Sequence, residues 1–152
     1  MIDERLSNIK FRGQRVDGKG WVHGYYHQVT KGAFVNPIQN ASVITTYKAL
    51  DNGEIILTGA FAVIPETVGQ YIGKEDKNGA EIYRGSIVKS DIHNPKTFLI
   101  DFIDGAFCAT HPKIKYYPID IMHFYDSTGC CIEVIGDIHT NPELLEVQNE
   151  SE

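Results

Sequence analysis

Three short turn segments, each placed between two runs of apolar and aromatic residues, constrain the fold of this chain most. They are Asp51-Asn52-Gly53, Asp104-Gly105 and Ser127-Thr128-Gly129. Glycine takes positive φ freely and Asn or Asp tolerates it, as tight hairpin turns require. The expected strand pairs are Thr45–Leu50 with Glu54–Leu57, Thr97–Ile103 with Ala106–Thr110, and Ile121–Tyr125 with Cys131–Ile135. The sequence therefore predicts a mainly β, hairpin-rich antiparallel protein.

The residues between the turns alternate as they do in half-buried strands. In the run 97–103, Phe98, Ile100 and Phe102 share one side of the expected strand. The run Trp21–His27 mixes aromatic and β-branched residues with polar ones and predicts a further strand. Helix signals are scarce. Asn141, followed by proline, predicts a short C-terminal helix.

The stretch Pro65–Lys89 indicates a division of the chain. It begins at a proline, and its polar loop 74–79 separates two runs rich in apolar and aromatic residues. We expect a β-rich N-terminal section over residues 1–64, a compact series of strands over 65–147, and a frayed acidic tail over 148–152. No long linker separates the sections, so we expect them to pack together. Short strands with tight turns after Pro65 favour a small, strongly bent barrel of the SH3-like kind.

Composition excludes several classes of protein. No apolar run approaches the roughly 18–20 residues that a membrane-spanning helix needs. The first residues include acids and lack the apolar core of a secretory signal. The three cysteines, Cys108, Cys130 and Cys131, do not have the spacing of a disulfide framework. We therefore expect a cytoplasmic protein with no membrane partner.

Charge is unevenly distributed along the chain. Residues 1–30 contain five Lys or Arg and three Asp or Glu, whereas eight acids and no Lys or Arg follow Lys115. A basic head and an acidic tail could attract each other within one chain or between subunits. A solvated acidic C-terminus is the simpler interpretation of the same pattern.

Three groups of segments carry a family resemblance. The first is Ile9–Gly13 with Trp21–Tyr25, the second is Val63–Gly73 with Asp76–Gly79 and Glu81–Gly85, and the third is Ile132–His139 with Asn141–Leu145. In their order and length these segments resemble the YopX family of phage and prophage proteins over roughly residues 9 to 146.

The resemblance implies an SH3-like C-terminal part and self-association into homo-oligomers, and it supplies no catalytic residues. The chain departs from the family at Ser86, where an acidic residue is typical. Serine can cap a turn there but cannot pair with a basic side chain, so any charge-based role of this position is in doubt.

Motifs that imitate catalytic or metal sites are better explained by structure. Gly136-Asp137-Ile138-His139 is similar to the opening of a metallophosphoesterase site, but such sites need several further ligands and no histidine follows. His23 and His27 lie on an expected strand, where their spacing does not suit one ion. Cys108 with His111 lacks any feature that would lower a thiol pKa. We therefore expect no catalytic, cofactor or metal site and a protein that is not an enzyme.

The N-terminal basic-aromatic segment is the one candidate binding surface. Its residues are Arg12, Arg15, Lys19, Trp21 and Tyr25. Cations placed between aromatic rings are typical of single-strand nucleic-acid surfaces, but a net charge of −6 opposes phosphate binding. The main hypothesis is a non-enzymatic, phage-encoded protein that acts through contacts with itself and with an unidentified phage or host protein. The alternative is a nucleic-acid-binding β protein that uses this segment.

Overall fold

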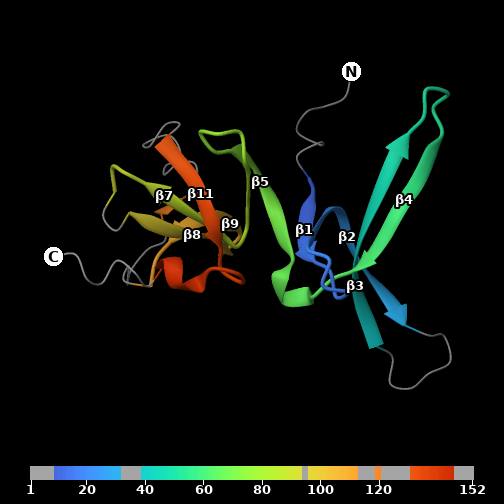
Figure 1. The fold of residues 1–152 in the computed structure, drawn as a ribbon, viewed down its shortest axis with the longest axis horizontal. Helices are drawn as coiled ribbons and strands as arrows, with labels where there is room; N and C mark the ends of the chain where they lie inside the picture. The colour runs from blue at the N-terminus through green and yellow to red at the C-terminus, as the bar shows by residue number, and fades with distance from the viewer. Residues whose placement is uncertain (1–8, 32–38, 94–95, 113–118, 121–130, 146–152) are drawn as a thin grey trace. The chain divides into compact units, whose positions relative to one another are not determined.

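The chain folds into two compact, mainly β units. The computed structural model describes residues 9–31, 39–93, 96–112, 119–120 and 131–145. The N-terminal unit is Met1–Tyr71 and the C-terminal unit is Ile72–Glu152 (Figure 1). The expected mainly β, antiparallel fold is therefore confirmed.

The N-terminal unit is one antiparallel sheet. Its strands are β1 (Phe11–Gln14), β2 (Trp21–Lys31), β3 (Gln39–Ala49), β4 (Ile55–Ala62) and the start of β5 (Gly69–Glu75), and a 3-10 helix, η1 (Pro65–Thr67), precedes β5. The strand order is β4-β3-β2-β1-β5. The long strand β3 therefore lies between β2 and β4.

The two neighbours of β3 are offset along its length. Residues 39–45 of β3 pair with β2, and residues 43–49 pair with β4, so only Val43–Thr45 have a strand on both sides. Ile44, at the centre of this segment, is fully buried. The close approach of β2 and β3 depends on Gly24, because a β carbon there would lie 2.3 Å from the Thr45 carbonyl oxygen. Both ends of β3 are consequently parts of two-stranded ribbons (Figure 1).

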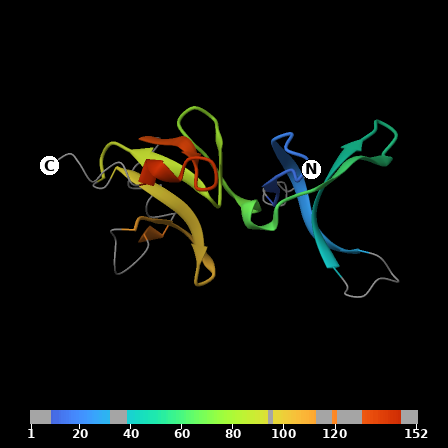
Figure 2. The ribbon, with the colours of Figure 1, turned by 60° about the horizontal axis from the view of Figure 1, so that its bottom comes forward.

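The C-terminal unit contains a second, strongly twisted sheet (Figure 2). Its strands are β7 (Ser86–Ser90), β8 (Thr97–Ile103), β9 (Ala106–Thr110), β10 (Ile119–Asp120) and β11 (Ile132–Asp137), in the antiparallel order β10-β9-β8-β7-β11. The end of β5 pairs with β6 (Glu81–Tyr83). The unit has its own core, formed by Ile82, Val88, Phe98, Ile100, Ala109 and Ile132.

The turns agree with the sequence to different degrees. Strands β8 and β9 have the expected bounds, and φ is positive at both Asp104 (51°) and Gly105 (82°), as a primed two-residue turn requires. At the β3–β4 turn only Gly53 has positive φ, and the Leu50 amide donates to the Glu54 carbonyl over 2.8 Å. This turn is therefore a three-residue loop that ends in a left-handed glycine. The third expected hairpin, with its turn at 127–129, lies outside the described residues.

Two finer expectations are not confirmed. The described strands of the C-terminal unit form no closed barrel, so the SH3-like barrel stays a prediction. The expected C-terminal helix is described only as a single 3-10 segment, η3 (Pro142–Leu145). The helical segments in the described ranges are short 3-10 turns, and none has the length and apolar character needed to cross a membrane.

Asp76 organises the loop between β5 and β6. Its Oδ1 accepts hydrogen bonds from the Asn78 and Ala80 amides, and its Oδ2 accepts one from the Val134 amide over 2.8 Å. Burial disfavours the charged carboxylate, but these three donors outweigh that cost and lower its pKa below 3.8. One carboxylate thus connects the loop to β11 within the C-terminal unit.

We expect Asp76→Asn to lower the free energy of unfolding by about 1–3 kcal/mol at neutral pH, because an amide cannot accept all three hydrogen bonds. A lowered pKa in the folded state means that the stabilisation is complete above pH 3.8 and is lost as pH falls through the folded-state pKa. The difference from wild type should therefore disappear in acid, as measured by urea unfolding across pH. Asp104→Asn, in an exposed turn that tolerates asparagine, is the control and should change little; a pH-independent difference for Asp76→Asn would contradict the account.

Candidate interaction surface

One face of the N-terminal sheet gathers three of the five candidate residues. In the β1–β2 register Arg12 lies opposite His23, and Gln14 lies opposite Trp21. Cross-strand partners share a face and side chains alternate along a strand, so Arg12, Trp21 and Tyr25 lie on the same side. The Arg12 guanidinium lies 4.5 Å from the Trp21 ring centroid, and the Tyr25 and Tyr47 rings are 6.0 Å apart. We call the set Arg12, Trp21, His23, Tyr25 and Tyr47 the aromatic face.

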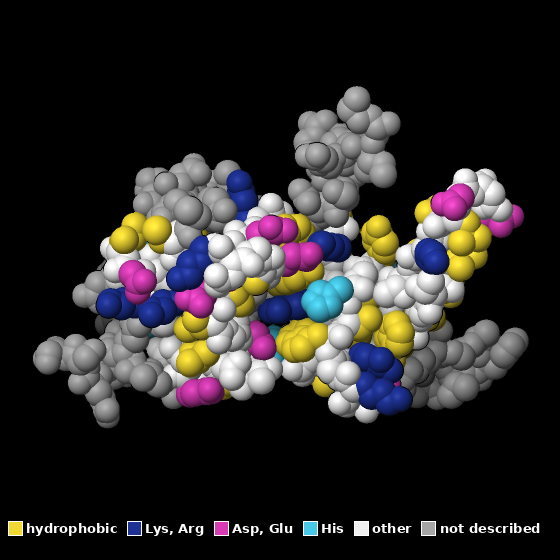
Figure 3. All heavy atoms as spheres, turned by 45° about the horizontal axis from the view of Figure 1, so that its top comes forward, with side chains coloured by type: hydrophobic (Ala, Val, Ile, Leu, Met, Phe, Trp, Pro, Cys, Tyr) yellow, Lys and Arg dark blue, Asp and Glu magenta, His cyan; other side chains and the backbone are white. Residues whose placement is uncertain are grey.

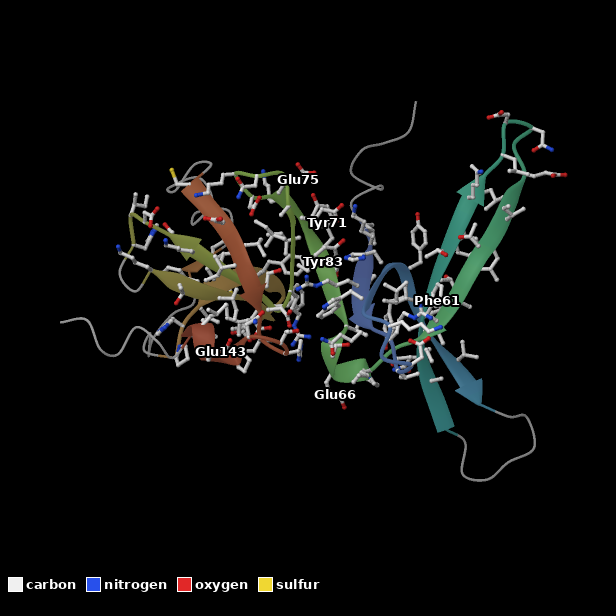
Figure 4. All side chains as sticks on the ribbon, viewed as in Figure 1. Phe61, Glu66, Tyr71, Glu75, Tyr83 and Glu143 are labelled. Carbon is white, nitrogen blue, oxygen red and sulfur yellow. The ribbon has the colours of Figure 1, made fainter. Side chains whose placement is uncertain are left out.

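Arg15 lies on the opposite side of the sheet. Its guanidinium is 4.4 Å from the ring centroid of Phe61, which pairs with the buried Ile44 on β3. Figure 4 labels Phe61 at the inner end of the β3–β4 hairpin. Arg15 also forms an ion pair with Asp17, and this hydrogen bond lowers the Asp17 pKa. The candidate segment is therefore divided between two faces.

Lys19 belongs to neither face. It lies in the exposed turn between β1 and β2, where its amide donates to Asp17 Oδ1 over 3.1 Å. Lys19 was grouped with the aromatic residues because it is close to them in sequence. In the structure it lies in the turn, beyond the paired residues of β1 and β2.

The charge asymmetry of the sequence follows the two units. Residues 1–71 contain seven Lys or Arg and six Asp or Glu, whereas residues 72–152 contain seven and fourteen. The strands β1, β2, β3 and β4 contain no Asp or Glu at all. The acids of the N-terminal unit are therefore confined to turns and to residues outside these strands.

The most exposed apolar surface lies at the outer end of the β3–β4 hairpin. Here β3 and β4 pair only with each other, and we call residues 46–58 the β3–β4 ribbon. The exposed fractions of its large apolar side chains are 50% for Tyr47, 71% for Ile55, 43% for Ile56 and 57% for Leu57. Figure 3 shows hydrophobic side chains along this projecting hairpin and acidic ones at its tip. Tyr47, Ile55 and Leu57 share one face of the ribbon, and grouped apolar exposure of this kind marks interaction sites.

Sequence reasoning assigned these residues to a hairpin and missed their exposure. A signal was present, because Ile55-Ile56-Leu57 breaks the alternation of a half-buried strand and places apolar side chains on both faces. In a buried strand such a run is ordinary. Here the run lies where β3 and β4 pair only with each other, and all three side chains are exposed.

The residues that imitate catalytic motifs have structural roles. Asp137 Oδ1 accepts hydrogen bonds from the amides of His139 and Thr140, both over 2.9 Å, and so forms the turn that precedes η3. Burial raises the pKa of the Cys108 thiol, which leaves it a poor nucleophile. Ser86 Oγ accepts a hydrogen bond from the Tyr83 amide over 3.0 Å, so the serine caps a turn at the position where the family typically has an acidic residue. Within the described ranges no three His, Cys, Asp or Glu side chains gather as metal ligands.

A model of a known family, described as YopX protein, matches residues 10–146 of the chain. The chain belongs to the YopX family. Matches to this YopX-family chain among solved structures include the crystal structure of protein EF1440 from Enterococcus faecalis, with 23% sequence identity and a TM-score of 0.50. The alignment covers 90% of this chain and 97% of that one, and at this identity it shows a shared fold alone. No protein with a curated description matches.

We expect Arg12→Ala, but not Arg15→Ala, to change the environment of Trp21, which is the single tryptophan of the chain. Removing the guanidinium that covers the indole should shift its emission to longer wavelength and increase quenching by acrylamide. Arg15→Ala is the control, because Arg15 stacks on Phe61 instead. Equal effects of the two substitutions would contradict the assignment of Arg12 and Arg15 to opposite faces.

Proposed function

We propose that this YopX-family chain is a non-enzymatic protein of phage or prophage origin that acts in the bacterial cytoplasm through protein–protein contacts. In this proposal it self-associates and contacts an unidentified phage or host protein. The observation that carries the proposal is the apolar β3–β4 ribbon, which projects from its unit without a second layer of its own over either face in the described residues. A two-stranded ribbon is marginally stable by itself, so a protein contact would stabilise it as well as bury it.

The number of exposed apolar side chains on the β3–β4 ribbon limits the free energy that self-association through it can gain. Covering the still-exposed half of a large apolar side chain contributes about 1 kcal/mol. Two copies would bring Tyr47, Ile55, Ile56 and Leu57 twice, for a gross contribution of roughly 8 kcal/mol. This is comparable with micromolar affinity, but association also costs several kcal/mol of rigid-body and side-chain freedom. The apolar side chains alone therefore support weak association, and a stable assembly needs further contacts.

We expect the wild-type chain to form oligomers at micromolar concentration in size-exclusion chromatography with light scattering. The double substitution Ile55→Ser/Leu57→Ser should shift the distribution to monomer, because it removes apolar area without removing a backbone hydrogen bond. Phe102→Ser is the matched control, since Phe102 is 50% exposed and lies on the C-terminal unit. A strictly monomeric wild type would contradict self-association.

A second candidate function is binding of single-stranded nucleic acid by the aromatic face. The observation that favours it is the acid-free composition of β1 to β4 together with the shared face of Arg12, Trp21 and Tyr25. Bases stack on exposed aromatic rings of β-sheets, and a carboxylate-free surface does not repel phosphate. The small cation excess of residues 1–71 limits the strength of such binding.

This second candidate predicts that a labelled single-stranded oligonucleotide binds at low salt and dissociates as salt is added. Arg12→Glu should weaken binding more than Arg15→Glu, because only Arg12 lies on the aromatic face, and Tyr25→Ala should weaken it about tenfold through lost stacking. Fluorescence anisotropy measures all three. Absence of binding at low salt, or equal effects of the two arginine substitutions, would remove this candidate.

A further inference from the structure

The outer edge of β4 presents backbone groups that no neighbouring strand of the described chain uses. β4 is the end strand of the N-terminal sheet. The Val63 amide donates to the Ser42 carbonyl, and the Leu50 amide donates to the Glu54 carbonyl. These two bonds show which residue pairs are hydrogen-bonded at each end of the β3–β4 ladder. Because bonded and non-bonded pairs alternate in an antiparallel ladder, the amides and carbonyls of Ile55, Leu57 and Ala60 point away from β3.

Most of the devices that prevent edge pairing are missing from β4. Its sequence, IILTGAFA, contains no charged residue and no proline. In the described residues its protections are the bulge in its pairing with Thr46 and Tyr47 and, at its C-terminal end, the turn whose Val16 amide donates to the Ala62 carbonyl. An edge with free donors and acceptors and apolar side chains is a template for another strand.

Charge around β4 selects both the partner and its direction. The turn before β4 carries Asp51 and Glu54, whereas Arg15 stacks on Phe61 near the other end of the strand. The Val16 amide donates to the Ala62 carbonyl, so this turn lies beside the end of β4; it carries Arg15 and Lys19 against Asp17, with which Arg15 is ion-paired, and so retains a net positive charge. An antiparallel copy of β4 places the acidic turn of each chain near the basic turn of the other, whereas a parallel copy places like charges together.

We propose that β4 pairs in antiparallel orientation with β4 of a second copy of this chain, so that the two N-terminal sheets join into one. The inference rests on the self-association of the proposed function and specifies its geometry. A two-fold axis at β4 makes the same edge complementary to itself, as an isologous interface requires. It also places Ile55 and Leu57 of both copies on one face of the joined sheet, and the new backbone hydrogen bonds supply the further contact that the side chains alone lack.

Amide hydrogen exchange of the wild-type chain tests the pairing directly. Exchange at Ile55, Leu57 and Ala60 should slow by at least about tenfold when protein concentration rises from below to well above the dissociation constant, because pairing closes these amides to water. The amides of Ile56 and Phe61, which face β3, serve as internal controls and should change little. Concentration-independent exchange at the three outward amides of an oligomeric protein would overturn edge pairing.

A proline substitution separates the backbone contact from the side-chain contact. Ala60→Pro removes an outward donor that the β3 ladder does not use. It should weaken self-association by about thirtyfold, which corresponds to two hydrogen bonds of about 1 kcal/mol in a symmetric dimer. Ala60→Ser keeps the donor and is the control.

The outcomes of these experiments separate the two proposals. A monomeric wild type overturns both self-association and edge pairing. Oligomers that depend on Ile55 and Leu57 but show no protection of the outward amides leave the proposed function standing and overturn edge pairing. Because exchange is measured on the wild-type chain, the test holds even if Ala60→Pro fails to fold.

Discussion

The offset of β2 and β4 along β3 is the constraint on which the N-terminal unit depends. Both neighbours flank β3 only over Val43–Thr45, and the buried Ile44 lies there. Beyond this segment, toward Ala49, β3 pairs only with β4, and the large apolar side chains Tyr47, Ile55, Ile56 and Leu57 are exposed there. The β3–β4 ribbon begins where the pairing of β2 with β3 ends, and β4 is the end strand of the sheet, so its outer edge has no strand beside it in the described residues.

Local chemistry made part of the fold predictable. The Asp104-Gly105 turn fixed the bounds of β8 and β9 correctly, because a primed turn requires residues of this kind at adjacent positions. The same reasoning found the β3–β4 turn but made its strands too short, since strand length depends on partners far away in sequence. The offset of β2 and β4 is likewise a long-range property that no local pattern encodes.

The candidate site shows the same limit at the level of single side chains. Arg12 and Arg15 are near in sequence and were grouped with Trp21, yet an odd separation along an extended chain places them on opposite faces. The alternation of side chains along a strand would have assigned Arg12 and Arg15 to opposite faces if the bounds of β1 had been known. The apolar run Ile55-Ile56-Leu57 was visible in the sequence, but its exposure depends on which elements pack over the two faces of β4, and no local pattern encodes that.

Sedimentation equilibrium of wild type and a shortened variant tests the central claim, that the β3–β4 ribbon mediates self-association, most directly. In the variant, residues 47–57 are replaced by an Asn-Gly turn, which leaves the segment Val43–Thr45 paired on both sides. The account predicts an oligomeric mass for the wild type and a monomeric mass for the variant, with an unchanged C-terminal unit. A monomeric wild type would contradict it. So would a folded variant that still assembles with the same number of chains as the wild type.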